Sequence, residues 1–422
     1  MVKFLSETVV FKGIHLRKVR EGTTDVFVPD PLYYVKNKSE YIPTALPVFY
    51  NPVMEINRDL TILAVKTYLD LSQEISENDG KILYVEALAG TGIRGFRLLN
   101  EINDPRLEVI MNDIDNLSKD LMHFNAAQLS ITDNRLIITN YEANYLFAKL
   151  CNDRRKPDII EIDPYGSPAR FIYNAIRCLK SKGGMLLVTA TDTAPLVGKF
   201  TNAAMRKYGC YLIKSPFNKE VAIRALIYFV GREASILARR VIPIFGIFTH
   251  HFIKLGFLIK RGRKEADKFW ENVGWVAFCN ICTEYYISKG LQNRPSSLCE
   301  IKEHGVTEIL GPLWVGKIFE EEFSRMMLKN LDHLNINQRN AKLIRRIFEW
   351  ELSAPHIPFF YDLQEIARRL RMSTPSINMV VDELRRRGFE ASRTHFNPRG
   401  IKTDAKIRDI VEVLKGISAS LA

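Results

Sequence analysis

The feature that most constrains the fold is a series of short, largely apolar runs between residues 81 and 260, each separated from the next by a helix-length segment. Strands that are buried on both faces have such sequences, and parallel strands need long crossover connections between them. The pattern therefore predicts a doubly wound α/β fold with a parallel sheet. The expected strands are residues 82–85, 109–111, 136–138, 159–162 and 185–188.

Two later apolar runs, residues 242–248 and 252–259, stand too close together for a crossover helix between them. They follow a helix-like stretch at residues 220–240, so we expect them to pair as an antiparallel edge of the sheet.

A change of pattern near residues 261–268 predicts a domain boundary. The chain has 422 residues, which is more than one hydrophobic core usually serves. Between residues 262 and 311 the alternation of apolar runs and helix-length segments becomes irregular. Apolar residues at helical spacing return at residues 319–331 and 338–352. We expect a larger domain at residues 1–265 and a smaller α+β domain at residues 266–422.

The end of the chain has the spacing of a helix-turn-helix, with short helices expected at residues 362–370 and 375–387. Gly388 is a helix stop, and the residues after it can form a wing, so we expect a winged-helix-like tail. Basic runs at residues 368–371 and 385–387 fall on these helices. Such runs are usually solvated faces, but their clustering here favours contacts with phosphate groups.

The charge balance favours a polyanionic partner. The chain carries 60 Lys and Arg against 48 Asp and Glu, a formal net charge of +12, and nucleic acid attracts such a chain through counterion release. We find no apolar stretch long enough to span a membrane and no secretory signal, and we expect a cytoplasmic protein without a disulfide framework. No obligate protein partner is inferred.

A glycine-containing turn follows the first expected strand. Residues 84–94 run through Gly90 and Gly92 into an expected helix, where a ligand can approach the backbone. Taken alone, this turn is as easily an ordinary strand-to-helix connection. A dinucleotide-binding dehydrogenase is disfavoured, because its third glycine would stand at a different spacing.

Acidic residues follow the next two strands. Asp113 stands at the tip of the second strand, where a carboxylate commonly holds a ribose diol. Asp115 is better explained as a helix cap, because its short carboxylate can accept from free amide groups. Glu142 and Ala143, after the third strand, are candidates to flank an adenine ring.

The strongest signal is the segment Asp163-Pro164-Tyr165-Gly166, which follows the fourth strand at the edge where open α/β sheets bind ligands. An exocyclic base amine is a poor nucleophile, and Asp163 can accept its proton. Pro164 fixes the backbone, and Tyr165 offers a flat face to an extruded base. The alternative is a plain turn, since these residue types also favour turns.

At these residues the sequence resembles the family of tRNA (guanine-N2-)dimethyltransferases. The similar segments are residues 49–52, 57–60, 86–94, 163–168, 189–192, 207–209, 311–314 and 402–405, so the resemblance covers nearly the whole chain. It implies a Rossmann-like class I methyltransferase sheet in residues 1–265 and a tRNA-binding domain in residues 266–422. It also implies transfer of one or two methyl groups from S-adenosylmethionine to the N2 of guanine 26 in tRNA.

The resemblance assigns roles to single residues. Arg58 and Arg94 would meet the carboxylate of the cofactor, and Asp113 would meet its ribose. Glu142 and Ala143 would lie at its adenine. Phe49 and Tyr165 would line the site for the cofactor or the guanine. Asp163 would accept the proton of the amine, and the carbonyl of Pro164 would orient that amine. Without the resemblance, Arg58 could be an exposed helix charge, Arg94 a phosphate contact and Phe49 part of the core.

Four residues of the second domain suggest a structural zinc site. Cys279 and Cys282 have the spacing of a zinc half-site, but the second half, Cys299 with His304, is irregular. The alternative is that the cysteines pack as small buried groups.

Two other functions remain open on the sequence. A nucleic-acid binder could use the α/β domain only as a scaffold. A DNA adenine methyltransferase also uses an Asp-Pro-aromatic segment on an exocyclic amine.

Overall fold

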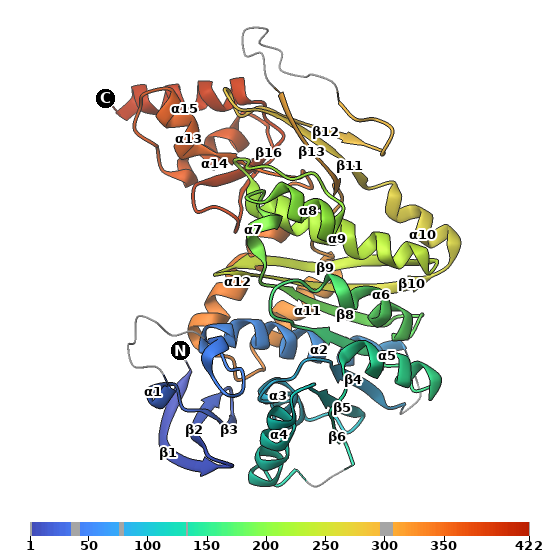
Figure 1. Cartoon of the computed structure of the whole chain (residues 1–422). Coiled ribbons are helices and arrows are strands. Elements are labelled where there is room, and N and C mark those ends of the chain that lie inside the picture. The colour runs from blue at the N-terminus through green and yellow to red at the C-terminus, as the bar shows by residue number, and fades with distance from the viewer. Residues whose placement is uncertain (1, 35–42, 76–79, 132–133, 296–306, 422) are drawn as a thin grey trace. The chain divides into compact units, whose positions relative to one another are not determined.

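The computed structural model (Figure 1) describes residues 2–34, 43–75, 80–131, 134–295 and 307–421. Their contacts divide into two units. Unit 1 comprises Met1–Pro164, Arg170–Thr189 and Arg325–Arg345, and unit 2 comprises Tyr165–Ala169, Ala190–Ser324 and Arg346–Ala422. The expected functional division at residue 265 stays a prediction.

All five expected parallel strands are present. The strands are β4 (Ile82–Glu86), β5 (Leu107–Asn112), β6 (Leu136–Thr139), β7 (Ile159–Ile162) and β8 (Met185–Ala190). The seven-stranded sheet has the order β6-β5-β4-β7-β8-β10-β9, and β4 pairs in parallel with both β5 and β7. Every residue of β4, β7 and β8 is buried, while β6 is half-buried at the edge of the order, which agrees with the apolar runs.

The expected antiparallel pair is also confirmed, as β9 (Arg239–Thr249) and β10 (Phe252–Arg261). The preceding helix α9 (Asn218–Ile236) ends before residue 240, because Ala238 takes a positive φ and β9 starts at Arg239. The sheet is thus mostly parallel, with one antiparallel pair.

The strand order determines where ligands can bind. The chain moves outward from β4 to β6 through α3 (Ile93–Glu101) and α4 (Asn116–Gln128). It then returns to β7 and β8 through α5 (Ala143–Asn152) and α6 (Ala169–Cys178), where Asn174 donates to Asn144 at 2.9 Å. Open α/β sheets bind ligands at the carboxyl ends of the strands where the strand order reverses, which in this sheet is at β4 and β7.

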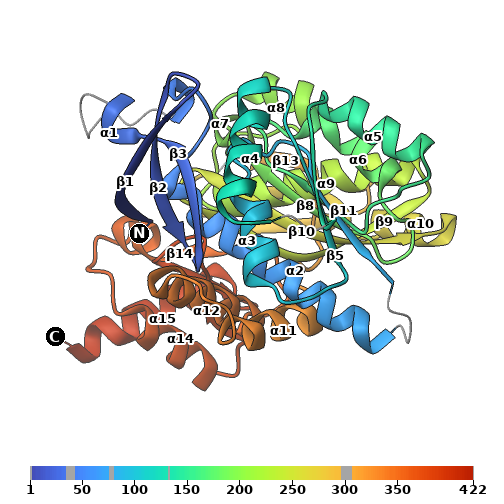
Figure 2. The same cartoon turned by 90° about the horizontal axis from the view of Figure 1, so that it is seen from below.

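A small N-terminal sheet was not expected from the sequence. It consists of β1 (Lys3–Phe11), β2 (Ile14–Glu21) and β3 (Thr24–Pro29), all antiparallel. Leu16 and Phe27 pack against Leu121 of α4, and Figure 2 shows the sheet beside α3 and α4. The chain then runs through α1 (Pro31–Tyr34), η2 (Pro43–Ala45) and η3 (Pro52–Met54) into the long helix α2 (Glu55–Ile75).

The described part of the loosely patterned segment after residue 262 forms a second sheet. After α7 (Thr193–Leu196), α8 (Thr201–Tyr208), α9 and α10 (Arg263–Trp270), the sheet has the order β12-β11-β13. Its strands are β11 (Val273–Cys279), β12 (Tyr285–Lys289) and β13 (Thr307–Trp314), and β11 pairs antiparallel with both neighbours.

The helices expected in the last third are present within a few residues. They are α11 (Glu321–Leu331), α12 (Gln338–Ser353), α13 (Leu363–Arg369) and α14 (Ile377–Arg386), and α15 (Ile407–Leu421) follows. The short strands β14 (Tyr361–Asp362), β15 (Ala391–Arg393) and β16 (Gly400–Thr403) form an antiparallel sheet in the order β14-β16-β15. No helix among the described residues is long and apolar enough to cross a membrane.

Candidate active site

The turn between β4 and α3 depends on its glycines. Gly90 and Gly92 have φ values of 54° and 75°, which side chains rarely adopt. A Cβ atom on Gly92 would lie 2.8 Å from Cγ of Met122, and one on Gly90 would lie 3.2 Å from the carbonyl oxygen of Phe49. The turn therefore packs closely against Met122 and against the backbone of Phe49, which is a predicted site residue.

Asp113 reaches the same turn from the end of β5. Its Oδ2 accepts from the backbone N–H of Gly90 at 2.8 Å, and its Oδ1 accepts from Asp115 at 3.0 Å. Burial raises the pKa of Asp113, although these backbone donors act in the opposite direction. A carboxylate can accept further bonds beyond these two, so Asp113 can still bind a diol.

Two other acidic residues cap helices. Asp115 accepts from the backbone N–H groups of Leu117 and Ser118, which confirms the expectation that it caps α4. Glu142 caps α5 by accepting from Tyr145 at 3.0 Å, and its side chain is exposed. Ala143 is buried beside it.

The guanidinium of Arg94 is the centre of a buried acidic cluster. It donates to Glu86 at 2.8 Å and to Asn57 at 3.0 Å, and it forms an ion pair with Asp163. The carboxylate of Glu161 acts on it electrostatically as well. The three hydrogen-bond partners of Arg94 named here are side chains of the protein, and the expected contact from Arg94 to the cofactor stays a prediction.

Glu86 is an acid of this cluster whose pKa is strongly perturbed. Burial raises its pKa to about 7, Arg94 opposes the rise, and Glu161 and Asp163 add to it. Its Oε2 is buried and has no hydrogen-bond partner among the described residues. Such an orphaned acceptor beside a glycine turn fits a site that binds a cationic ligand.

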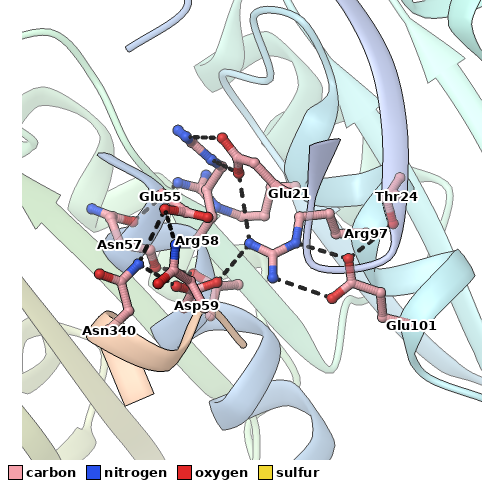
Figure 3. Close-up of polar contacts among 12 residues, drawn as sticks. Glu21, Thr24, Glu55, Asn57, Arg58, Asp59, Arg97, Glu101 and Asn340 are labelled. Carbon is pink, nitrogen blue, oxygen red and sulfur yellow. Dashed lines mark hydrogen bonds and ion pairs between the residues drawn. The ribbon is translucent and has the colours of Figure 1, made fainter. Parts of the chain in front are cut away.

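Arg58 belongs to a second buried network (Figure 3), where it donates to Glu21 at 2.6 Å. Arg97 lies 2.7 Å from Asp59 and 3.6 Å from Glu21, and it also pairs with Glu101. Sequence reasoning missed Glu21, because nothing near it in the chain indicates a partner on α2.

Asp163 follows β7, and its side chain is only 17% exposed. Tyr165, two residues on, is 56% exposed, and Gly166 has a φ of 78°. The segment thus combines a nearly buried carboxylate held by a buried cation with an accessible aromatic ring. Chemically, the carboxylate can take a proton and the ring can stack on a base.

The expected zinc ligands are only partly described. Cys279 is buried at the end of β11 and Cys282 is half-buried, whereas Cys299 and His304 lie outside the described residues. Within the described part of the chain, no group of three or more His, Cys, Asp or Glu residues could hold a metal ion.

Comparisons with known proteins agree over nearly the full chain. Residues 29–415 match the family described as N2,N2-dimethylguanosine tRNA methyltransferase. A tRNA (guanine(26)-N(2))-dimethyltransferase of Methanosphaera stadtmanae is 32% identical over 94% of this chain and 96% of its own length. The enzyme of the same name from Methanocaldococcus jannaschii is 32% identical over 94% of this chain and 98% of its own.

A solved structure is similar as well. It is the complex of Trm1 from Pyrococcus horikoshii with S-adenosyl-L-methionine, with a TM-score of 0.78 and 28% identity. The match covers 94% of this chain and 99% of that chain.

Proposed function

The chain belongs to the N2,N2-dimethylguanosine tRNA methyltransferase family, and on that premise we propose how its residues methylate guanine 26 of tRNA. The enzyme transfers one or two methyl groups from S-adenosylmethionine to the exocyclic N2 of this guanine. The full-length match carries the assignment, and the pairing of Asp163 with buried Arg94 supports the chemistry.

The reaction needs a proton acceptor. The lone pair of the N2 amine is delocalised into the purine ring, and S-adenosylmethionine supplies a methyl group on a cationic sulfur. Asp163 accepts the proton that the amine loses, and the ion pair with Arg94 fixes the direction of its carboxylate. The carbonyl of Pro164 orients the amine, while Phe49 and Tyr165 line the base and cofactor site.

The remaining candidate residues hold the cofactor. Asp113 binds the ribose hydroxyls, and Glu142 with Ala143 lies at the adenine. Arg58 and Arg94 contribute at the carboxylate end, where their ion pairs with Glu21 and Glu86 fix both guanidiniums. The three carboxylates around Arg94 leave the site with an excess of negative charge, which favours a sulfonium ligand.

Residues 266–422 form the tRNA-binding domain in this proposal, and α13 and α14 with the strands after them form a winged-helix-like tail. The side chains of Arg368 and Arg386 are 70% and 76% exposed and can contact phosphates. Each is also paired with a glutamate, Glu365 or Glu383, so part of the positive charge is compensated. We propose a cytoplasmic enzyme, since tRNA is its substrate.

The proposal also includes a structural zinc ion held by the cysteines of the second domain. The backbone N–H of Ile281 donates to Sγ of Cys279 at 3.4 Å, and that of Thr283 donates to the Cys279 carbonyl at 2.9 Å. The bond from Ile281 to the sulfur is of the kind that supports a metal-bound thiolate, and the bond from Thr283 fixes the turn. Metal analysis of the purified protein tests the proposal: one zinc per chain, lost on Cys279→Ser, supports it, and a metal-free protein contradicts it.

Nucleoside analysis tests the function. A tRNA transcript incubated with the protein and methyl-labelled S-adenosylmethionine is expected to contain N2-methylguanosine or N2,N2-dimethylguanosine at position 26. A transcript with adenine at position 26 and a DNA duplex serve as controls. Methylation of DNA adenine, or of tRNA without guanine 26, would contradict the assignment.

A further inference from the structure

The backbone that follows Tyr165 is held by hydrogen bonds within unit 2. The N–H of Gly166 donates to Oγ1 of Thr191 at 2.7 Å, and the N–H of Thr191 donates back to the carbonyl of Gly166 at 3.0 Å. Both backbone groups of the residue after Tyr165 are thereby fixed.

A second set of bonds holds the next residue. The hydroxyls of Ser167 and Tyr208 lie 2.7 Å apart, and the Tyr208 hydroxyl donates to Oδ1 of Asp192 at 2.7 Å. Lys207 donates to the other oxygen of Asp192 at 2.8 Å. Because Tyr208 gives its single proton to Asp192, Ser167 must be the donor in the first bond.

The location of these groups makes the bonds strong. Tyr208 is fully buried, and the side chain of Asp192 is only 11% exposed. Burial and the neighbouring Asp192 raise the pKa of Tyr208, so its hydroxyl keeps its proton at neutral pH. Hydrogen bonds in such surroundings are weakly screened, and breaking one leaves a buried group without a partner.

Gly166 shows that the loop needs a particular backbone shape. Its φ is 78°, yet an added Cβ would meet nothing within 4 Å. Glycine is therefore required for its conformation and not for lack of space. A loop of this shape keeps its geometry through the bonds from Thr191 and Tyr208.

We propose that Tyr208 and Asp192 are positioning residues for the target guanine, acting through the Ser167 hydroxyl and the Gly166 backbone on the orientation of Tyr165. This inference rests on the proposed function, in which the exposed ring of Tyr165 stacks on the extruded base. In this proposal neither the tyrosine nor the aspartate contacts the guanine or S-adenosylmethionine. They fix the loop that carries the ring, and small displacements of a reacting group reduce rates strongly.

Single-turnover methylation of tRNA tests the proposal with Tyr208→Phe, which removes only the hydroxyl. We expect the methyl-transfer rate to fall by about 10- to 100-fold. The dissociation constant for S-adenosylmethionine should stay close to that of the unchanged protein, and the melting temperature should fall by only a few degrees, because buried groups lose a partner. Tyr228→Phe, in helix α9 of the same unit, is the matched control and should keep the full rate.

A fluorescent base gives a readout that a structural defect alone does not change. In a tRNA with 2-aminopurine at position 26, stacking on Tyr165 quenches the emission, and Tyr208→Phe should weaken this quenching. Ser167→Ala breaks the bond to Tyr208, and Tyr208→Phe breaks that bond together with the one to Asp192. The double variant should therefore be no worse than Tyr208→Phe alone.

Three results would overturn the inference: a Tyr208→Phe rate within about twofold of the unchanged protein, unaltered quenching, or additive losses in the double variant. Each can occur while the unchanged protein still methylates guanine 26, so failure of the inference is distinct from failure of the proposed function.

Discussion

Replacing Arg97 with Met should strongly destabilise unit 1. The Arg97 side chain is 0% exposed, and its guanidinium lies 2.7 Å from Asp59, 3.0 Å from Glu101 and 3.6 Å from Glu21 (Figure 3). Met fills a similar space without charge, so three buried carboxylates lose one shared cation. Removing one partner of a buried ion pair typically costs about 3–5 kcal/mol, and we expect a loss in that range.

The loss should depend on pH. Burial raises the pKa of both Asp59 and Glu101 above their ordinary values, and Arg97 opposes the rise. Without Arg97 both folded-state pKa values rise further, so the folded protein binds more protons than the unfolded chain. Stability then falls as pH increases, and the deficit should be larger at about pH 8 than at about pH 5.

Urea denaturation followed by circular dichroism at both pH values measures the effect. Lys149→Met is the matched control, because it breaks an exposed ion pair with Asp153 and should change stability little. A midpoint for Arg97→Met that equals the control at both pH values would refute the reasoning, since Asp59 and Glu101 would then need no buried counter-charge.

Three further predictions concern the glycine turn and its acids. Burial raises the pKa of Glu86 to about 7, so the ionised fraction of Glu86 increases as pH rises from about 6 to 8. The affinity for cationic S-adenosylmethionine should therefore increase over this range, and binding should release protons. Calorimetry in two buffers measures this release, and Glu86→Gln should abolish the pH dependence. Asp113→Ala should weaken cofactor binding by about 10-fold or more through the lost ribose bonds, with unchanged tRNA affinity in a filter-binding assay. Gly92→Ala should destabilise the protein by about 1–3 kcal/mol in urea denaturation, because it combines a φ of 75° with a 2.8 Å clash against Met122; Gly183→Ala, with the same φ and no atom within 4 Å, should cost less.

The central sheet could be predicted because its signal is local. Strands such as β4 and β8 are buried along their whole length, and burial on both faces produces uninterrupted apolar runs. The strand β1 was missed because much of it is exposed, so its sequence mixes polar and apolar residues. The sheet β12-β11-β13 was missed for a similar reason: β12 is mostly half-buried, and Gly, Asn and Ser interrupt the segment.

The candidate site was predicted where chemistry and strand ends coincide, as at Asp163 and Asp113. The partners of the arginines could not be predicted. Arg58 pairs with Glu21, which lies 37 residues earlier, and Arg94 pairs with Asp163, which lies 69 residues later. Such pairings arise only when the fold brings separate elements together, and no local pattern encodes them.

The most direct test of the account is methyl transfer by Asp163→Asn, which keeps the shape of the side chain and removes the proton acceptor. We predict that the single-turnover rate at guanine 26 falls by about 100- to 10,000-fold. Affinities for tRNA and S-adenosylmethionine should stay within about threefold of the unchanged protein. Asp153→Asn, an exposed carboxylate, is the control and should keep full activity. If Asp163→Asn methylates guanine 26 at the unchanged rate, Asp163 is not the proton acceptor and the proposed mechanism is wrong.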